Sequence, residues 1–430
     1  MRPQTILPCL LGAALGAAGW MQALHWKSAA APATDEDAAG RIVALENELD
    51  LLRRENESLR SLAQGGGEVK VEPELVAFVE QSLGLSFRSS PQIHRIAGEE
   101  LQDRIAATIE SRYGPHGLDS REQAWQLMGL LAADDRFAPQ MAATQSIGAR
   151  SWFDNQGGEG WVTHRFDPQS VPDQAALVRT LARILIHQNH PPAAGSEWPG
   201  DEAATCREAI QHGAAIAIEN RFLARQALAS GFTGVKDESG ARELLDALSS
   251  FVRGLATFPS SLGLARAGRL MDQEEILSGL YSPPAITANF FDGFDDLKAN
   301  PPTLPAASDE FLLEESAGML GLNLWLQPLG EEAIPLADAW RGDRYRLFAT
   351  SDNDVHLVWD IRFDSAASAD AFVKTALTAV AAMAGAETDP AVGTILTTPE
   401  DRFVGIQRSA PEVVRFINAA TQEGAASLAP

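Results

Sequence analysis

The chain has 430 residues, of which 45% are hydrophobic and 7% aromatic, enough for a sizeable core in one large domain or two smaller ones. Its formal net charge is −24, and an acidic field of this size repels phosphate backbones, so nucleic-acid binding is not expected. The two cysteines, Cys9 and Cys206, exclude a disulfide framework and a Cys-x-x-Cys metal pair.

Residues 1–30 differ in character from the rest of the chain. A single charge, Arg2, precedes a largely apolar run over residues 6–26, close to the ~20 residues that cross a bilayer as a helix. Small residues at 29–33 offer cleavage sites, so the alternatives are an uncleaved signal anchor, which we favour, and a cleaved signal peptide. Either one places the remaining chain outside the cytoplasm, in the cell envelope, as a membrane-anchored or secreted protein.

A coiled coil is predicted over residues 41–64, after an acidic linker at 31–40. The alternating spacing of three and four that marks an a/d seam is carried by Ile42, Leu45, Leu49, Leu52, Asn56 and Leu59. An asparagine at an a position favours two parallel strands in register. We therefore expect a parallel homodimer, with a single solvated amphipathic helix as the alternative. A glycine-rich linker at 65–72 ends the helix.

The main body divides by pattern into a mostly helical portion at 73–300 and a smaller portion at 301–430. Helices are expected in the first portion at 73–83, 97–112, 121–132, 173–190, 202–229, 239–256 and 273–279. Ser170 is expected to cap the fourth of these, with Asp173 completing a capping box. A strand hairpin is predicted over 151–167, around an Asn-Gln-Gly-Gly turn.

The 301–430 portion mixes helices with antiparallel strands. The pattern predicts a helix that Ser308 caps, a hairpin, a second helix, two strands and a last helix, at 308–326, 345–363, 366–384, 393–397, 402–408 and 411–422. This mixture indicates an α+β fold and not a doubly wound sheet. The portion either folds independently or packs on the same domain as residues 73–300.

Five segments share an order and spacing with a known family. They are Ser151-Trp152-Phe153-Asp154 with Gly160-Trp161-Val162, the stretch 181–187, Gln211-His212-Gly213-Ala214, Ser282-Pro283-Pro284 and Trp340-Arg341-Gly342-Asp343. Together they resemble exported bacterial metallopeptidases of the zincin (gluzincin-like) type. In that family a hairpin precedes a His-Glu-x-x-His helix, and Glu-Gly-x-Ala, Pro-Pro and Trp-x-Gly-Asp motifs follow. The resemblance covers about residues 75–375 and implies a zincin-like core with a small β-hairpin or sheet.

The resemblance also implies that the family's chemistry is absent. A zincin needs two histidines at i and i+4 on one helix, with a glutamate beside the first as base. The aligned positions hold Arg183, Ile184 and His187. Arginine cannot lose its proton to become a ligand, and isoleucine cannot act as a base. His212 stands at the position of the third-ligand glutamate, and Asp292 at that of an accessory histidine. No cofactor is therefore expected.

A rebuilt zinc site is the alternative. His187, His190 and His212 could share one ion if the family packing holds. We favour a different interpretation, in which His190 is an exposed residue at a helix C-terminus, His187 a hydrogen-bonded remnant and His212 a semi-buried polar residue. Trp340 and Asp343 are expected to serve the structure, Asp343 by capping a turn.

Three functions are compatible with these observations. The leading expectation is a non-catalytic pseudo-metallopeptidase that binds a peptide or protein partner, or acts as a scaffold, outside the cytoplasm. The second is a divergent metallohydrolase that uses the three histidines. The third is a purely structural envelope protein, which a filled cleft with Arg183 paired to an acidic side chain would favour.

Overall fold

The computed structural model describes part of the chain, namely residues 69–430 without 114–116, 192–199, 231–244, 246–247, 306–310, 350–353 and 389. The chain divides into two units, residues 1–65 and 66–430. The predicted membrane helix at 1–30 and the predicted coiled coil at 41–64, with Leu45, Leu49, Leu52, Asn56 and Leu59, lie outside the described residues. All elements below belong to the second unit.

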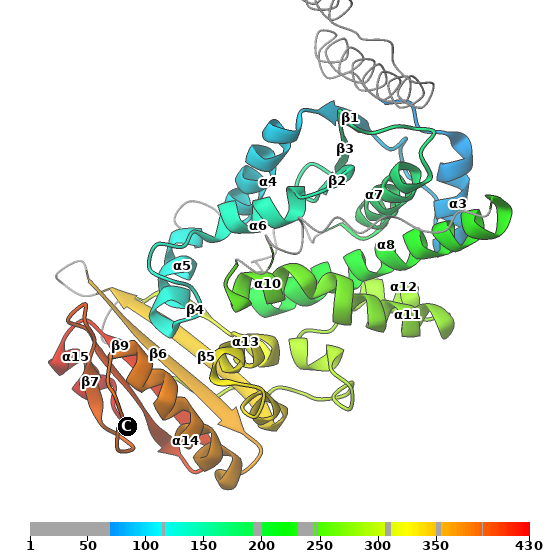
Figure 1. Cartoon of the computed structure of the whole chain (residues 1–430). Coiled ribbons are helices and arrows are strands. Elements are labelled where there is room, and N and C mark those ends of the chain that lie inside the picture. Colours follow the sequence, from blue (N-terminus) through cyan, green and yellow to red (C-terminus); the bar gives the residue numbers. More distant parts are fainter. Residues whose placement is uncertain are drawn as a thin grey trace, which may run out of the picture. The chain divides into compact units, whose positions relative to one another are not determined.

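Helices dominate the first part of this unit (Figure 1). They are α3 (Pro73–Leu83), α4 (Gly98–Tyr113), α5 (Gly117–Met128), α6 (Phe137–Ser146), α7 (Val171–Asn189), α8 (Asp201–Ser230), α10 (Ser250–Thr257), the π-helix η2 (Pro259–Gly263), α11 (Leu264–Asp272), α12 (Ile276–Tyr281) and the 3-10 helix η3 (Thr287–Phe290). Helices α7 and α8 pack side by side at the centre. Most side chains of α7, among them its leucines, isoleucines and alanines, are buried because other elements surround the helix.

Most of the predicted helices are confirmed, with α6, η2, α11 and η3 as additions. Of the helix predicted at 239–256, the part that the structure describes as a helix is α10, and most of 239–249 lies outside the described residues. The pattern missed α6 because its sequence is rich in alanine and has almost no apolar periodicity. The capping box at Ser170 is wrong in detail. Ser170 is the N-cap residue of α7, but its side chain makes no capping hydrogen bond. Asp173 instead accepts a hydrogen bond from the backbone N–H of Asp167 at 2.6 Å.

The predicted hairpin is confirmed as β2 (Ser151–Asp154) and β3 (Glu159–Thr163). A third strand, β1 (Ile93–Ile96), runs parallel to β3, which gives the order β1-β3-β2. The hydroxyl of Thr180 on α7 donates to Ser151 Oγ at 2.8 Å, and Ser151 Oγ donates to the carbonyl of Ala176 at 2.7 Å. These bonds fix one face of the sheet on α7, and among the described strands β2 pairs only with β3. Strand β2 is therefore an edge strand.

The C-terminal part is built on a six-stranded antiparallel sheet, so the fold is mixed α+β as predicted. The strands, in the order β4-β5-β6-β9-β8-β7, are β4 (Phe311–Glu315), β5 (Trp340–Ala349), β6 (Val355–Phe363), β9 (Val413–Ala419), β8 (Phe403–Ala410) and β7 (Ile395–Thr397). Three helices accompany them, α13 (Gly318–Leu326), α14 (Ala366–Met383) and α15 (Gln422–Leu428), along with the 3-10 helices η4 (Gln327–Leu329) and η5 (Ile334–Ala339). Phe372 on α14 packs against Phe363 and Trp325, which places α14 on one face of the sheet (Figure 1).

Two predictions for this part are wrong. The expected last helix at 411–422 is instead the buried strand β9, followed by α15. Its Val-Val-Arg-Phe-Ile run is rich in β-branched and aromatic residues, which suit a central strand that is covered on both faces. The helix expected to begin at Ser308 begins at Gly318, and strand β4 precedes it. Ser308 itself lies outside the described residues.

Among the described residues, α14 alone is long and apolar enough to cross a membrane by length and composition. Its buried side chains include Ala369, Phe372, Val373, Ala376 and Val380. A core helix of a folded domain has the same composition, so this feature is weak evidence for a membrane span. The packing of α14 on the sheet accounts for its apolar face.

The sheet and the helices belong to one unit, and two buried hydrogen bonds connect them. The side-chain amide of Asn418 on β9 donates to the carbonyl of Leu127 at 2.9 Å. The indole N–H of Trp325 on α13 donates to the carbonyl of Met128 at 2.9 Å. Both acceptors lie at the C-terminal end of α5, where helix carbonyls lack intrahelical partners. The sheet thus completes the hydrogen bonding of this helix end.

Candidate functional site

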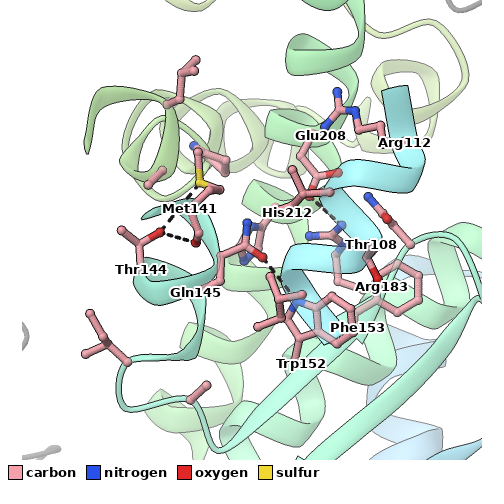
Figure 2. Close-up of a pocket in the computed structure, with 18 of the residues that line it drawn as sticks. Thr108, Arg112, Met141, Thr144, Gln145, Trp152, Phe153, Arg183, Glu208 and His212 are labelled. Carbon is pink, nitrogen blue, oxygen red and sulfur yellow. Dashed lines mark hydrogen bonds and ion pairs between the residues drawn. The ribbon is translucent and has the colours of Figure 1, made fainter. Parts of the chain in front are cut away.

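A cavity of about 380 Å³ lies between α4, α6, α7, α8 and the free edge of β2 (Figure 2). This volume is at the small end of the range for ligand sites, roughly 300–1,000 Å³. One wall is apolar, formed by Ile105, Ile109, Phe137, Met141, Leu255 and Pro259. The polar lining residues include Arg112, Arg179, Arg183, Glu208 and His212. The cavity thus offers an apolar surface and a cluster of titratable groups to one ligand.

The centre of this cluster is an ion pair between the two central helices. Arg183 Nη2 on α7 donates to Glu208 Oε1 on α8 at 2.7 Å. The Arg183 side chain is only 8% exposed, and its guanidinium carbon lies 5.0 Å from the centre of the Phe153 ring. Because a buried charge without its partner is strongly destabilising, each member of this pair depends on the other.

Glu208 and His212 are one turn apart on α8 and face the same side. Burial alone would raise the pKa of Glu208, but the charges of Arg183, His212 and Arg112 outweigh burial and lower it to about 2. Burial, and then the charge of Arg183, lower the pKa of His212 to about 3, and Glu208 only partly opposes them. His212 is therefore neutral at pH 7, and Arg183 is the main charge that keeps Glu208 ionised there. Some of the His212 surface is exposed, but it faces the cavity.

His187 and His190 point to other surroundings. The half-buried ring of His187 lies 5.6 Å from that of Phe153, and a Cβ on Gly158 would lie 3.0 Å from it. The prediction that His190 is exposed is wrong, because it is 6% exposed and its ring stacks edge-on with Tyr281 at 4.1 Å. Proline at 191 follows directly, so the helix ends with His190 turned inward as its C-cap residue.

The remaining positions from the resemblance are also apart from the cavity. Ile184 is a fully buried core residue. Asp292 is exposed and pairs with Arg269 on α11 at 3.3 Å. Within the part of the chain that the structure describes, no three His, Cys, Asp or Glu side chains converge as metal ligands would. The structure thus brings Arg183 and His212 together, but does not bring His187, His190 and His212 into one group.

Glu208 was missed from sequence as the partner of Arg183, although a signal was present. Arg183 and His187 are four residues apart on α7, and Glu208 and His212 are four apart on α8. The same interval of 25 residues therefore separates Arg183 from Glu208 and His187 from His212. Only the first of these pairs forms a contact in the structure.

A close backbone contact sets the position of α8 beside the cavity. A Cβ on Gly213 would lie 2.3 Å from the carbonyl oxygen of Gly263, and a Cβ on Gly263 would lie 2.5 Å from that of Ala209. Only glycine allows α8 and the π-helix η2 to approach this closely. Gly213 follows His212 directly, and η2 begins with the cavity residue Pro259. The contact therefore fixes the position of α8 relative to η2 at the cavity.

A second buried polar group is centred on Asp343 of β5. Its carboxylate accepts hydrogen bonds from the backbone N–H of Ala317 at 2.8 Å and of Gly318 at 2.9 Å, so it caps the first turn of α13. The indole N–H groups of Trp340 and Trp359 donate to the same carboxylate at 3.0 Å and 2.8 Å. These contacts account for Trp340 and Asp343 as structural residues.

Glu202 at the start of α8 extends this group. Its Oε1 accepts from the backbone N–H and the hydroxyl of Thr287 at 2.7 Å and 2.8 Å. The Ser316 hydroxyl lies 3.2 Å from Glu202 Oε2 and 3.0 Å from Asp343 Oδ1. Because a hydroxyl has one proton, Ser316 donates to only one of these two carboxylates at a time, and a protonated Glu202 can donate to Ser316 Oγ while Ser316 donates to Asp343. Burial, and then the charge of Asp343, raise the pKa of Glu202 to about 7, although the hydrogen bonds from Thr287 and Ser316 lower it.

Comparison with known proteins gives one match. The family model for a domain of unknown function (DUF8575) matches residues 310–429, which extend from β4 to α15. No curated protein and no solved structure matches the chain. The match includes Asp343 and Ser316, but the described cavity residues all precede it in the chain.

Proposed function

We propose that the chain is a non-catalytic, zincin-like protein of the cell envelope whose cavity binds a peptide segment of a partner. The N-terminal segment would hold it at the membrane, and the heptads at 41–64 would make it a parallel dimer. The observation that carries the proposal is the Arg183–Glu208 ion pair, which lies within a cavity that stays large enough for a ligand.

The ion pair argues against hydrolysis by a bound metal. Arg183 keeps its positive charge at any physiological pH and would repel a divalent cation from the position that the resemblance assigns to a ligand. Glu208 is the carboxylate that contacts Arg183, and its ionised group is already bound there. A base that activates water would have to lose this pairing first, at the cost of a buried unpaired charge.

The edge of β2 supports a peptide as the ligand. Ser151, Trp152 and Phe153 of this strand line the cavity, and the strand has one unpaired edge among the described strands. An edge strand presents backbone donors and acceptors to an extended chain, which then pairs as a further strand. The apolar wall would take alternate side chains of the same peptide.

The test uses the whole chain and a library of immobilised peptides. We expect binding that Thr108→Trp abolishes, because Thr108 lines the cavity and a tryptophan there would fill it. The matched control is Thr394→Trp, which adds the same side chain at an exposed site in the loop before β7. Binding that survives Thr108→Trp would overturn the cavity as the binding site, and no binding at all would favour the purely structural interpretation.

The metallohydrolase alternative is tested on the same preparation. Metal analysis of the purified chain is expected to give no stoichiometric zinc. One zinc per chain, lost together with peptide hydrolysis in His187→Ala, would establish the alternative and overturn the proposal. A half-buried control on β1, His94→Ala, separates a specific loss of zinc from a general loss of histidine.

A further inference from the structure

The unused hydrogen-bond donors of Arg183 suggest what the cavity binds. A guanidinium has five N–H donors, and among the described residues Glu208 is the acceptor for one nitrogen, Nη2. The other two nitrogens of Arg183, Nε and Nη1, have no acceptor among the described residues. They are nevertheless not closed off from solvent. They therefore reach the cavity, on a side chain that is only 8% exposed. An acceptor from a ligand would satisfy them.

His212 beside Arg183 has the same property. Neither of its ring nitrogens has a hydrogen-bond partner among the described residues, and neither is sealed from solvent. Arg183 lowers the pKa of His212 by more than Glu208 raises it, and Arg179 lowers it further. The cavity lining holds three arginines, Arg112, Arg179 and Arg183, against the single carboxylate of Glu208, and Arg179 is paired with Glu219 at 3.1 Å, so positive side chains predominate around His212. An anionic acceptor fits such a site better than a neutral carbonyl.

We propose that Arg183 and His212 bind the C-terminal carboxylate of a peptide, whose last side chain then lies on the apolar wall of Ile105, Ile109 and Met141. A carboxylate has two oxygens that match parallel N–H groups of a guanidinium, which a single backbone carbonyl cannot do. This inference rests on the proposed peptide-binding function and adds that the cavity holds the end of the peptide and not its middle.

The ligand's charge does not have to displace Glu208. Glu208 accepts from one of the two N–H groups of Nη2, so a second carboxylate can pair with the other N–H of Nη2 together with the parallel N–H of Nε or Nη1. His212, neutral at pH 7, can donate an N–H to an oxygen of the ligand without first taking up a proton. Both groups come from the packed helices α7 and α8, so the site is built before the ligand arrives.

The test compares peptide acids with their amides. The probes are acetyl-Ala-Ala-Xaa tripeptides with leucine, phenylalanine, methionine or valine last, each as the free acid and as the C-terminal amide, titrated into the whole chain by calorimetry. We expect the best acid to bind about 10-fold or more tightly than its amide, because a charge-assisted hydrogen bond is lost. Octanoate is included as a carboxylate without a peptide backbone and is expected to bind more weakly.

The variants separate recognition from folding. Arg183→Met combined with Glu208→Met removes both charges together and leaves neither unpaired. This double variant is expected to bind acid and amide equally. The matched control, Arg346→Met with Glu314→Met, removes an ion pair between β5 and β4 and should keep the preference for the acid. If the first double variant does not fold, Arg183→Lys keeps the charge but not the paired donors, and should reduce the preference several-fold.

Each contrary result has its own meaning. An amide that binds as tightly as its acid would overturn the carboxylate inference, while the proposed peptide binding would stand. Octanoate that binds more tightly than every peptide acid would overturn the peptide as the source of the carboxylate. No binding by any acid would overturn the inference, and the peptide library would then decide whether the proposed function fails with it.

Discussion

Replacing Glu202 by glutamine should make the protein more stable at high pH and leave it unchanged at low pH. In the folded chain Glu202 accepts two hydrogen bonds from Thr287 and shares a third with the Ser316 hydroxyl at 3.2 Å. A glutamine side chain can accept the first two through its carbonyl and donate the third through its amide. The substitution therefore preserves the hydrogen bonds and removes only the ability to ionise.

The size of the effect follows from the pKa of Glu202, which is about 7 when folded against an ordinary value of 4.5. Between these values the folded chain keeps a proton that the unfolded chain has released, so stability falls as the pH rises. The favourable contribution is complete below pH 4.5 and is lost above pH 7. The difference corresponds to about 3 kcal/mol, on the scale of 1.36 kcal/mol for each pH unit.

The assay is urea denaturation of the wild type and Glu202→Gln at pH 5, 6, 7 and 8. We expect the variant's free energy of unfolding to gain about 3 kcal/mol relative to the wild type from pH 5 to pH 8. Glu208→Gln is the control, because the pKa of Glu208 is about 2 and its destabilisation should not change over this range. A difference between wild type and Glu202→Gln that stays constant with pH would refute the proton assigned to Glu202.

Three further changes test the packing around the cavity and the N-terminal region. Gly213→Ala would place its Cβ 2.3 Å from the η2 backbone, so it should lower the free energy of unfolding, measured by chemical denaturation, by about 3 kcal/mol or more. The control is Gly268→Ala on α11, where no atom lies within 4 Å of the added Cβ. It should cost nothing and even stabilise that helix. Arg183→Met alone should lower the free energy of unfolding by about 3–5 kcal/mol, and adding Glu208→Met should restore most of it, while equal losses in the single and double variants would contradict the buried pair. Leu49→Asp at a predicted seam position should convert a dimer to a monomer in light scattering, and a wild type that is already monomeric would rule out the predicted coiled coil.

Elements with a clear apolar period were predictable from the sequence. The hairpin at β2 and β3 followed from its glycine turn, and α7 from its continuous apolar pattern before a pair of prolines. Strand β9 was misread as a helix because a fully buried strand has no alternation that distinguishes it from a buried helix segment. Only the neighbours β6 and β8, which bind it on both sides, decide its conformation.

The candidate site was predictable in part. The resemblance pointed to Arg183 and His212, and both line the cavity. It gave no indication of the apolar wall, because α4 and α6 approach α7 only through tertiary packing. His190 was expected outside because it ends a helix, yet its ring turns inward against Tyr281, a residue 91 positions away. Contacts between such distant residues leave no trace in local spacing.

The two hydrogen bonds from the sheet to α5 have a consequence for the family domain at 310–429. Trp325 and Asn418 lie inside the matched segment, but their acceptors, the carbonyls of Met128 and Leu127, lie outside it. Excised alone, this segment would leave an indole and an amide without their acceptors on the surface that faced α5. In this chain the matched segment therefore relies on α5 for the acceptors of two of its buried hydrogen bonds.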